Sequence, residues 1–371
     1  MVVAGTTPNM GQMAYDFSKN PMLVYWEMTQ ACGLACKHCR AEAMPSPHPL
    51  ELTTEESKRF LRQLPEFGHP LPHVIMTGGD PLNRTDIFEL IDYAKGLGID
   101  VSVTPAATSQ LTNDAISKLK AHGIQAMGLS LDGSNAERHD NIRAVPGTFE
   151  RTMEAARHCG RIGLPIQVNT LVAEETADDL PAIYELLRTS FPVMRWSLFM
   201  LISVGRGKQL NEVSPEEGES IMRWVFDLSP HAPFQIKTTE APSYRRIAIE
   251  EMRKANVATA DMKSRSVYRG FQIRDGHGIV FVSNLGEVYP SGFLPLHCGN
   301  VRTGSLVDIY RNSETFRALH SPDQFHGKCG ACEYSHICGG SRARAFAHTG
   351  DALGTDPFCP YEPVHPHAVT V

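Results

Sequence analysis

Short apolar runs alternate with longer amphipathic segments through the first half of the chain. The runs are rich in β-branched and aromatic residues, which is typical of buried strands. Six such strands are predicted, at 22–28, 73–77, 99–104, 125–131, 166–172 and 194–202. Strands separated by helices indicate βαβ units and a parallel sheet, either a partial barrel or an open sheet. In both folds the chemistry lies at the C-terminal ends of the strands.

The segments between these runs carry apolar residues at helical spacing. The first of them has a Thr followed three residues later by a Glu, which is a capping-box pattern. Helices are predicted at 52–64, 83–98, 111–123, 147–163 and 176–190. Cys159 lies beside the apolar stripe of its helix, so we expect it in the core.

The pattern changes after about residue 205. Helical stretches are predicted at 215–228 and 243–256. The segment GIVFVSNLGEVYPSG (278–292) predicts a β-hairpin, because two alternating strands flank an Asn-Leu-Gly turn. Beyond the hairpin the chain is rich in Cys, Gly and Arg.

Composition narrows the possible functions. The 371 residues are 42% hydrophobic and carry a formal net charge of −6, so no basic excess favours binding to nucleic acid or an acidic membrane. The N-terminal residues lack the basic and apolar regions of a signal peptide, and no apolar run has the length of a membrane span. We therefore expect a cytoplasmic protein with reduced thiols, in which nine cysteines suit metal binding better than disulfides.

Three of these cysteines follow the first predicted strand in TQACGLACKHCRAE (29–42). Cys32, Cys36 and Cys39 have the spacing C-x3-C-x2-C. A structural zinc site has four protein ligands, so three ligands leave one metal position open. Thiolates suit zinc or an iron–sulfur cluster.

C-x3-C-x2-C after the first strand of a partial β/α barrel resembles the signature of the radical S-adenosylmethionine (radical SAM) superfamily. His38 stands where the family has an aromatic residue. The resemblance implies a 4Fe–4S cluster whose free iron binds the amino and carboxylate groups of S-adenosylmethionine. Reductive cleavage of that cofactor would give a 5′-deoxyadenosyl radical. The alternative from the residues alone is a zinc site with a distant fourth ligand.

Two further segments resemble cofactor-binding motifs of the same family. MTGGDPL (76–82) is similar to its Gly-Gly-Glu motif, which implies that Gly78, Gly79 and Asp80 hold the amino group of S-adenosylmethionine. Asp80 is shorter than the usual Glu. As an alternative, Gly-Gly-Asp-Pro is an ordinary turn.

LSLDGSNAERHDNIRAVPGTFE (129–150) resembles the fourth-strand segment of the family. The resemblance implies that Ser130 and Asp132 lie near the ribose or the substrate, and that Arg143 pairs with the cofactor carboxylate. Asn169 on the fifth strand could face the cofactor. The alternatives are a surface ion pair for Arg143 and a strand-end cap for Asn169. No general acid or base stands out.

A second cysteine set lies near the C-terminus with the spacing C-x2-C-x5-C-x20-C. It consists of Cys329, Cys332, Cys338 and Cys359. Four thiolates can close a zinc site or hold a second iron–sulfur cluster. The set resembles the SPASM/twitch extension of radical SAM enzymes, which implies an auxiliary 4Fe–4S cluster. Ser291 and Arg342 stand where ligands of a further cluster would be, so we expect one auxiliary cluster. Cys298 is interpreted as a buried filler.

The predicted fold is therefore α/β: a partial (β/α)6 radical SAM barrel with a small C-terminal twitch/SPASM-like domain of a β-hairpin and helices. The predicted parts are an N-terminal arm (1–20), the barrel (21–210), a helical bridge (211–275) and the auxiliary-cluster domain (276–371).

The second cysteine set, GGSRARA and GNVRTGSLVDIYRNSETFR resemble the radical SAM enzymes of alternative haem and haem d1 biosynthesis. This resemblance implies oxidative decarboxylation or modification of tetrapyrrole propionates. Arg342 and Arg344 could then bind propionates, or they could neutralise the thiolates.

Two other functions stay open. One is modification of a ribosomally made peptide by crosslinking, thioether formation or epimerisation. The other is a non-enzymatic iron–sulfur electron-transfer protein. For an enzyme the expected partners are a tetrapyrrole or peptide substrate and an electron donor such as ferredoxin or flavodoxin.

Overall fold

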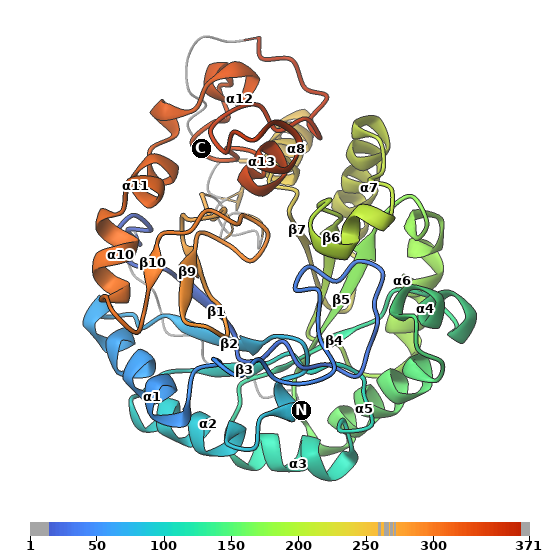
Figure 1. Ribbon diagram of the computed structural model, residues 1–371. Coiled ribbons are helices and arrows are strands. Elements are labelled where there is room, and N and C mark those ends of the chain that lie inside the picture. The colour runs from blue at the N-terminus through green and yellow to red at the C-terminus, as the bar shows by residue number, and fades with distance from the viewer. Residues whose placement is uncertain (1–14, 259–260, 263–266, 268–269, 271, 365–371) are drawn as a thin grey trace.

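The computed structural model describes residues 15–258, 261–262, 267, 270 and 272–364. Its strands curve around a central space and its helices lie outside them (Figure 1). The six predicted strands are present as β1 (Leu23–Glu27), β2 (His73–Thr77), β3 (Val101–Val103), β4 (Met127–Ser130), β5 (Ile166–Val172) and β6 (Arg195–Met200). Each pairs in parallel with the next, so the predicted partial barrel is confirmed.

The sheet is longer than the predicted barrel at both ends. Within the described residues the sheet has ten strands, in the order β10-β9-β8-β1-β2-β3-β4-β5-β6-β7. The added strands are β7 (Gln235–Thr239), β8 (Ile279–Val282), β9 (Glu287–Tyr289) and β10 (Gly299–Asn300). β7 lies inside the segment predicted as a helical bridge and pairs in parallel with β6, so a purely helical bridge is wrong.

The hairpin predicted at 278–292 is confirmed as β8 and β9, which pair antiparallel. It continues the barrel sheet, because β8 also pairs in parallel with β1. The physical reason is its apolar face: Val280 and Val282 are fully buried in the same core as β1.

Helices cover the outer face of the sheet. They are α1 (Thr54–Gln63), α2 (Ile87–Gly96), α3 (Asn113–Ala121), α4 (Ala136–Arg143), α5 (Thr148–Ile162), α6 (Leu180–Ser190), α7 (Pro215–Leu228), α8 (Tyr244–Lys254), α10 (Leu306–Asn312) and α11 (Glu314–His320). Two further helices, α12 (Gly327–Ala331) and α13 (Arg342–Thr349), lie in the C-terminal segment beyond one end of the barrel (Figure 1). The capping box at α1 is confirmed, with Thr53 and Glu56 bonded reciprocally. Within the described residues, no helix is long and apolar enough to span a bilayer.

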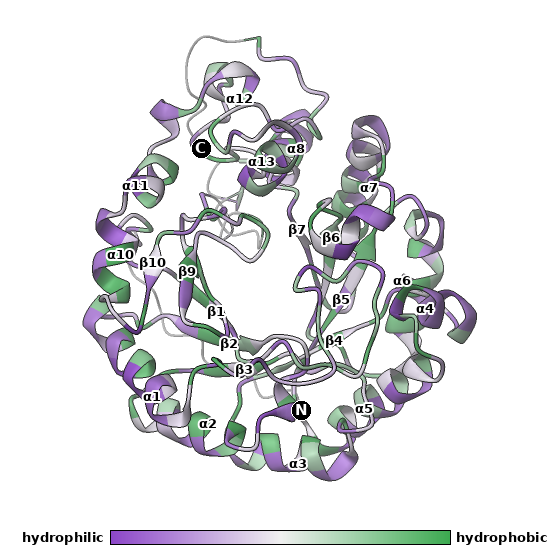
Figure 2. Ribbon diagram, viewed as in Figure 1, coloured by the Kyte–Doolittle hydropathy of each residue, from purple (hydrophilic) through white to green (hydrophobic). Residues whose placement is uncertain are grey.

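The main core lies between the sheet and these helices. Trp26 and Trp196 are fully buried on the outer face of their strands, and Cys159 of α5 belongs to the same cluster, as predicted. Figure 2 shows apolar residues along the strands and on the inner sides of the surrounding helices. Since side chains alternate along a strand, the residues between these core positions face the barrel interior.

The described part of the predicted N-terminal arm is held against the protein. The hydroxyl of Tyr310 donates a hydrogen bond of 2.5 Å to the carbonyl oxygen of Phe17, and Arg311 Nε donates to that of Lys19 at 2.9 Å. Residues 15–20 are therefore not loose, whereas 1–14 lie outside the described residues.

Candidate active site

The loop after β1 carries Cys32, Cys36 and Cys39, at the end of the barrel where active sites lie. Each sulfur accepts one N–H hydrogen bond. The donors are Leu34 N at 3.3 Å from Cys32 Sγ, Arg143 Nη1 at 3.7 Å from Cys36 Sγ and Ala43 N at 3.5 Å from Cys39 Sγ. Hydrogen bonds to sulfur help to set the potential of iron–sulfur clusters. The loop is thus organised around its thiol groups.

The surroundings of this loop fit a bound iron–sulfur cluster. Burial raises the pKa of the Cys32 thiol to about 11, so a thiolate here needs the positive charge of a metal. Three buried nitrogens at the loop have no hydrogen-bond partner among the described residues: His38 Nδ1, Arg143 Nε and Arg206 Nη2. Unpaired buried donors of this kind suit a site that binds a further group.

The Gly-Gly motif, Gly78 and Gly79, packs against the backbone just before Cys32. Gly79 N donates a 2.7 Å hydrogen bond to Thr29 O, and Asp80 N donates a 2.8 Å bond to Ala31 O. A Cβ atom on Gly78 would lie 2.4 Å from Thr29 O, and one on Gly79 would lie 2.5 Å from Ala31 O. Gly78 also has a φ of +147°, which favours glycine. The two glycines therefore allow backbone contact with the residues just before Cys32.

Replacing Gly79 with alanine is expected to destabilise the protein and to misplace the cysteine loop. The new methyl group would overlap backbone atoms that cannot move alone, which we expect to cost about 1–3 kcal/mol of unfolding free energy. Urea unfolding and iron content after anaerobic reconstitution measure the two effects.

Gly96→Ala is the matched control for this substitution. Gly96 ends α2, has no left-handed φ, and a Cβ atom there would meet no atom of the described residues within 4 Å. We expect it to stabilise the chain by about 0.4–1 kcal/mol and to leave iron content unchanged. Equal effects of the two substitutions would contradict the packing role of Gly79.

Asp80 is fully buried and its carboxylate is bonded within the protein. Oδ2 accepts a 2.6 Å hydrogen bond from Thr108 Oγ1, and Oδ1 accepts bonds from Leu82 N at 3.2 Å and Ala106 N at 3.4 Å. Burial raises the pKa of this carboxyl group, and these hydrogen bonds oppose the rise. In this conformation Asp80 joins the loops after β2 and β3. The resemblance predicted a contact with the cofactor amino group instead.

Asp132 and Arg143 meet beside the cysteine loop. Arg143 Nη2 lies 2.5 Å from Asp132 Oδ2, while its Nη1 reaches Cys36 Sγ. The other Asp132 oxygen accepts a 2.8 Å hydrogen bond from Leu171 N. Both side chains are largely buried, so the alternative of a surface ion pair for Arg143 is wrong. Burial raises the pKa of Asp132, but Arg143 and other neighbours outweigh it, so the net shift is downward and the carboxyl stays ionised.

Ser130 and Asn169 are direct neighbours in the sheet, on β4 and β5. Both are partly exposed, whereas Leu129 and Val168 beside them are buried in the core, so the two polar side chains face the barrel interior. The amide oxygen of Asn169 accepts a 2.8 Å hydrogen bond from Gln167 on the same face. The structure thus places the pair on the interior wall of the barrel.

A short 3-10 helix, Gly205–Gln209, also holds the cysteine loop, and sequence analysis missed it. Arg206 N donates a 3.0 Å hydrogen bond to Cys39 O, and Arg206 Nε donates one of 3.0 Å to Cys36 O. Gly205 has a φ of +53°, and a Cβ atom there would lie 2.5 Å from Arg40 O. The Gly-Arg-Gly run after the sixth strand was the available signal.

The four cysteines of the second set line a single cavity, although up to 30 residues of chain separate them. Cys329 accepts hydrogen bonds from Asp356 N and Arg342 Nη2, each at 3.3 Å. Tyr334 N and Gly340 N donate to Cys332 and Cys338, each at 3.4 Å. Burial raises the pKa of the Cys338 thiol to about 12. As at the first loop, burial disfavours a free thiolate, and N–H donors stabilise the sulfurs when they are bound to a metal.

No three His, Cys, Asp or Glu side chains in the described part of the chain are close enough to hold a single metal ion. An iron–sulfur cluster places irons and sulfides between its cysteines, so its ligands are spread more widely.

Arg342 and Arg344 are buried at the start of α13 and do not face the barrel interior as free cations. Arg342 is fully buried and bonds Cys329 Sγ together with the carbonyl oxygens of Ala352 and Gly354. Of the two alternatives, neutralising the thiolates therefore fits Arg342, and propionate binding does not.

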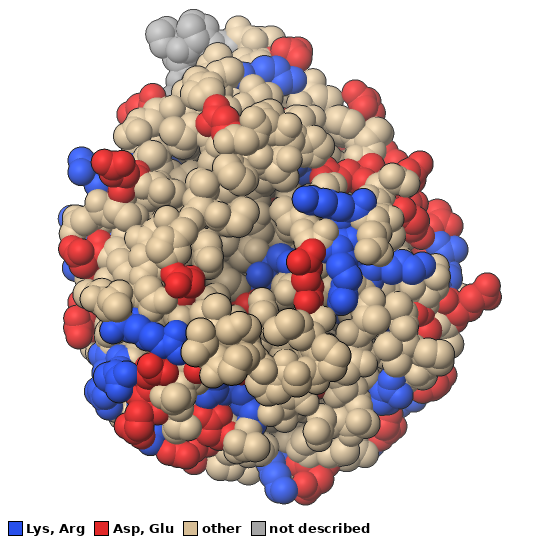
Figure 3. Space-filling view, in the orientation of Figure 1, with Lys and Arg blue, Asp and Glu red and all other residues tan. Residues whose placement is uncertain are grey.

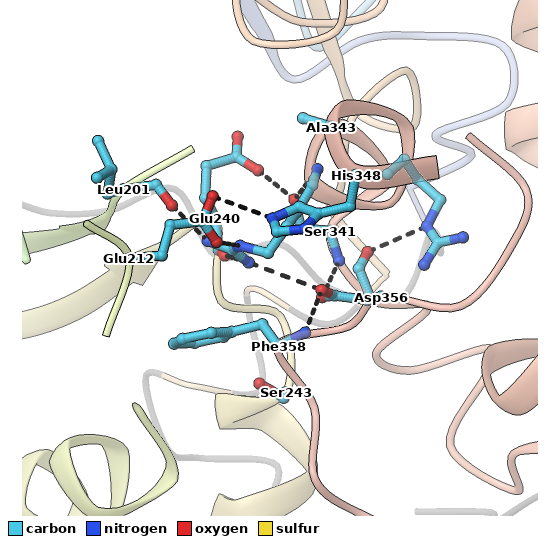
Figure 4. Close-up of polar contacts among 12 residues, drawn as sticks. Leu201, Glu212, Glu240, Ser243, Ser341, Ala343, His348, Asp356 and Phe358 are labelled. Carbon is cyan, nitrogen blue, oxygen red and sulfur yellow. Dashed lines mark hydrogen bonds and ion pairs between the residues drawn. The ribbon is translucent and has the colours of Figure 1, made fainter. Parts of the chain in front are cut away.

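Arg344 joins the C-terminal segment to the barrel. Its guanidinium donates to Glu212 Oε2 at 3.1 Å, to Glu240 O at 2.8 Å and to Leu201 O at 3.0 Å. Figure 4 shows Glu212, Glu240 and Asp356 around this junction, with Ser341 bonded to both Glu240 and Asp356. The guanidinium of Arg344 is thus bonded within the protein, so the alternative in which it binds propionates does not fit.

Cys298 packs against the main core, and its thiol donates a 3.2 Å hydrogen bond to Leu296 O. Its interpretation as a filler is consistent with this position.

Comparison with known proteins identifies the family. Residues 26–187 match the family model described as "Radical SAM superfamily". The chain is 38% identical to an AdoMet-dependent heme synthase of Oleidesulfovibrio alaskensis over 96% of this chain and 91% of that protein. A protein of the same name from Methanosarcina barkeri is 37% identical, over 92% of this chain and 97% of that one. The chain belongs to the radical SAM superfamily.

Solved structures agree with this assignment at the level of fold. This radical SAM chain matches Streptococcus suis SuiB bound to precursor peptide SuiA with a TM-score of 0.70 at 16% identity, over 92% of this chain and 76% of SuiB. It also matches anSMEcpe with bound AdoMet with a TM-score of 0.68 at 17% identity, over 91% and 94% of the two chains.

Membership makes the chain a radical SAM enzyme with a 4Fe–4S cluster and S-adenosylmethionine (AdoMet) as cofactors. Of its residues, Cys32, Cys36 and Cys39 match the cluster signature and lie at the C-terminal end of the barrel. The alternative of a non-enzymatic electron-transfer protein is therefore wrong.

Proposed function

We propose that this radical SAM enzyme oxidatively decarboxylates propionate groups of a tetrapyrrole to vinyl groups in haem formation. One observation carries the proposal: relatives named AdoMet-dependent heme synthase match it at 37–38% identity over at least 92% of this chain. Pre-heme d1 synthase of Dinoroseobacter shibae matches at 26% over 91% of the chain.

The residues around the cysteine loop would hold the cofactors. Cys32, Cys36 and Cys39 would bind the cluster, which together with S-adenosylmethionine supplies a 5′-deoxyadenosyl radical. Arg143 would bind the cofactor carboxylate through the nitrogen that has no partner within the described residues, while Asp132 fixes its orientation. Gly78 and Gly79 would bring backbone close to the amino group.

Ser130 and Asn169 would contact the adenosyl part from the interior wall. Their adjacent positions on β4 and β5 support this assignment. The polar interior would also place the substrate carbon next to the radical and keep bulk water away. We assign no contact with the cofactor to Asp80, because its carboxylate is already bonded.

The C-terminal region would bind an auxiliary 4Fe–4S cluster through Cys329, Cys332, Cys338 and Cys359, as in twitch/SPASM-type extensions. The shared cavity and the N–H donors to sulfur support this proposal. Converting a propionate to a vinyl group removes one hydrogen atom, one CO2 and one electron. The auxiliary site is suited to accept that electron, and a ferredoxin or flavodoxin would supply electrons for cofactor cleavage.

The test is anaerobic turnover of the reconstituted enzyme with iron-coproporphyrin III, S-adenosylmethionine and dithionite. Mass spectrometry would follow 5′-deoxyadenosine and the porphyrin together. We expect 5′-deoxyadenosine and porphyrins in which one and two propionates have each lost CO2 together with two hydrogens, since loss of CO2 alone would give an ethyl group.

One other result of this turnover experiment would point to a different substrate. 5′-Deoxyadenosine without any change in the porphyrin would contradict the tetrapyrrole substrate. It would favour a peptide, since PqqA peptide cyclase of Bradyrhizobium diazoefficiens also matches, at 26% identity over 93% of this chain.

A further inference from the structure

Lys237 lies in the middle of β7 and faces the barrel interior. Its neighbours at two-residue spacing both face inward: Gln235 accepts a 3.1 Å hydrogen bond from Arg195, and Thr239 lies 3.1 Å from the hydroxyl of Ser197. Ile236, between them, packs in the outer core. Because side chains alternate along a strand, Lys237 points to the same side as Gln235 and Thr239.

The ammonium group of Lys237 has no ion pair or hydrogen bond with any residue that the structure describes. Lys237 as a whole residue is exposed, although its side chain lies on an inner wall. Figure 3 shows that one face of the molecule is hollowed near its centre, with basic side chains and an acidic one at the hollow. A lysine that reaches an enclosed space without an acidic partner is ready to bind an anion.

Other charges around Lys237 keep the interior positive. Enclosure by protein lowers the pKa of Lys237 to about 8, with Arg195 and Arg245 adding to the shift, so it still carries a proton at neutral pH. Glu240 is the acid that opposes this shift, but burial and the neighbouring Asp275 raise its pKa and favour its neutral form.

The positive charge reaches across the barrel. Arg195 on β6 acts on Lys237 and, opposing the larger effect of Glu240, on the hydroxyl of Tyr25, which belongs to β1 on another wall. Burial raises the pKa of Tyr25 to about 12, so this hydroxyl stays protonated and able to donate. Lys237 and Tyr25 therefore lie in one interior region with the charge of Arg195, whose guanidinium is already bonded to Gln235 and Gln167.

We propose that Lys237 forms an ion pair with a carboxylate of the substrate inside the barrel, and that this contact selects a substrate with several carboxylates. The proposal rests on the proposed function and deepens it. While one propionate of a tetrapyrrole reacts, an ion pair to another propionate would fix the position of the whole substrate. The reacting carbon would then be held next to the radical. Arg342 and Arg344, the cations expected from sequence for this role, are occupied elsewhere.

The test compares two ligands on two proteins. Anaerobically reconstituted wild type and Lys237→Gln would be titrated by absorbance with iron-coproporphyrin III and with its uncharged tetramethyl ester. We expect the substitution to weaken binding of the free acid about 10- to 100-fold, as for a lost charged hydrogen bond, and to change ester binding little. Lys237→Arg keeps the charge and should recover part of the acid binding.

Two controls separate this effect from misfolding and from general loss of charge. Circular dichroism and iron content establish that each variant is folded and loaded. Lys118→Gln removes an exposed lysine of α3 that pairs with Asp114, and it should leave acid binding unchanged.

The outcomes distinguish the two proposals. If wild type decarboxylates the porphyrin but Lys237→Gln binds the acid equally well, the lysine contact is wrong and the proposed function stands. If wild type neither binds nor decarboxylates the porphyrin, both are wrong. Equal weakening of acid and ester binding would also overturn the ion pair, because it would indicate a steric effect.

Discussion

Replacing Cys32 with alanine is expected to abolish reductive cleavage of S-adenosylmethionine. Cys32 is one of three cysteines in a loop whose sulfurs each accept an N–H hydrogen bond. Two thiolates cannot hold the cluster in the geometry that leaves one iron open for the cofactor. Substitutions around metal ligands already cost about 10- to 100-fold in activity, so loss of a ligand should cost at least about 100-fold. Anaerobic assay of 5′-deoxyadenosine measures the loss.

Cys298→Ala is the control for this prediction. That thiol packs against the core and bonds the carbonyl oxygen of Leu296, away from the three-cysteine loop. The variant should load iron and cleave the cofactor as the wild type does. If Cys32→Ala formed 5′-deoxyadenosine at the wild-type rate, the cluster could not be held by this loop.

Apolar periodicity predicted the first six strands and the helices between them because each buries one face in a single core. Trp26 and Trp196 illustrate this pattern, since both are fully buried on the outer face of a strand whose alternate residues face inward. The fully buried stripe of α5 was equally visible in sequence.

Sequence analysis missed β7 because apolar periodicity detects only strands that bury a whole face in the core. In Gln235–Thr239 only Ile236 packs in the core, and the inward positions are polar because they line the interior. Such a strand has too few apolar residues to stand out. α4 was missed because its eight residues bury little more than His139 and Ile142. Both elements carry residues of the candidate site, so the weakest sequence signals lie where function needs polar side chains.

Spacing alone predicted which cysteines come together, but it could not tell what each nearby arginine contacts. Arg143 and Arg342 each bond a cysteine sulfur, whereas Arg344 joins Glu212 to two backbone carbonyl groups. An arginine reaches any of these partners by a choice of rotamer. Its role therefore depends on the packing of distant segments, which a local motif does not contain.

Replacing Cys338 with alanine is expected to remove the auxiliary cluster and to leave the cluster of the first loop. Cys338 lines the cavity shared by the four C-terminal cysteines and is bonded by Gly340 N. Iron and sulfide should fall from about eight to about four of each per chain. Because metal binding adds to folding stability, the melting temperature should fall as well. Iron and sulfide analysis with electron paramagnetic resonance of the reduced protein measures the change.

The activity pattern of this variant separates the two cysteine sets. Cys338→Ala should still form 5′-deoxyadenosine but release little decarboxylated porphyrin, since the electron left after CO2 loss has no acceptor. Ser335→Ala is the matched control, because Ser335 lines the same cavity without a thiol and should keep all its iron. Unchanged iron in Cys338→Ala, or zinc in the wild-type site, would contradict the auxiliary cluster. Full decarboxylation by a variant that lacks four irons would instead keep the cluster and reject its role as electron acceptor.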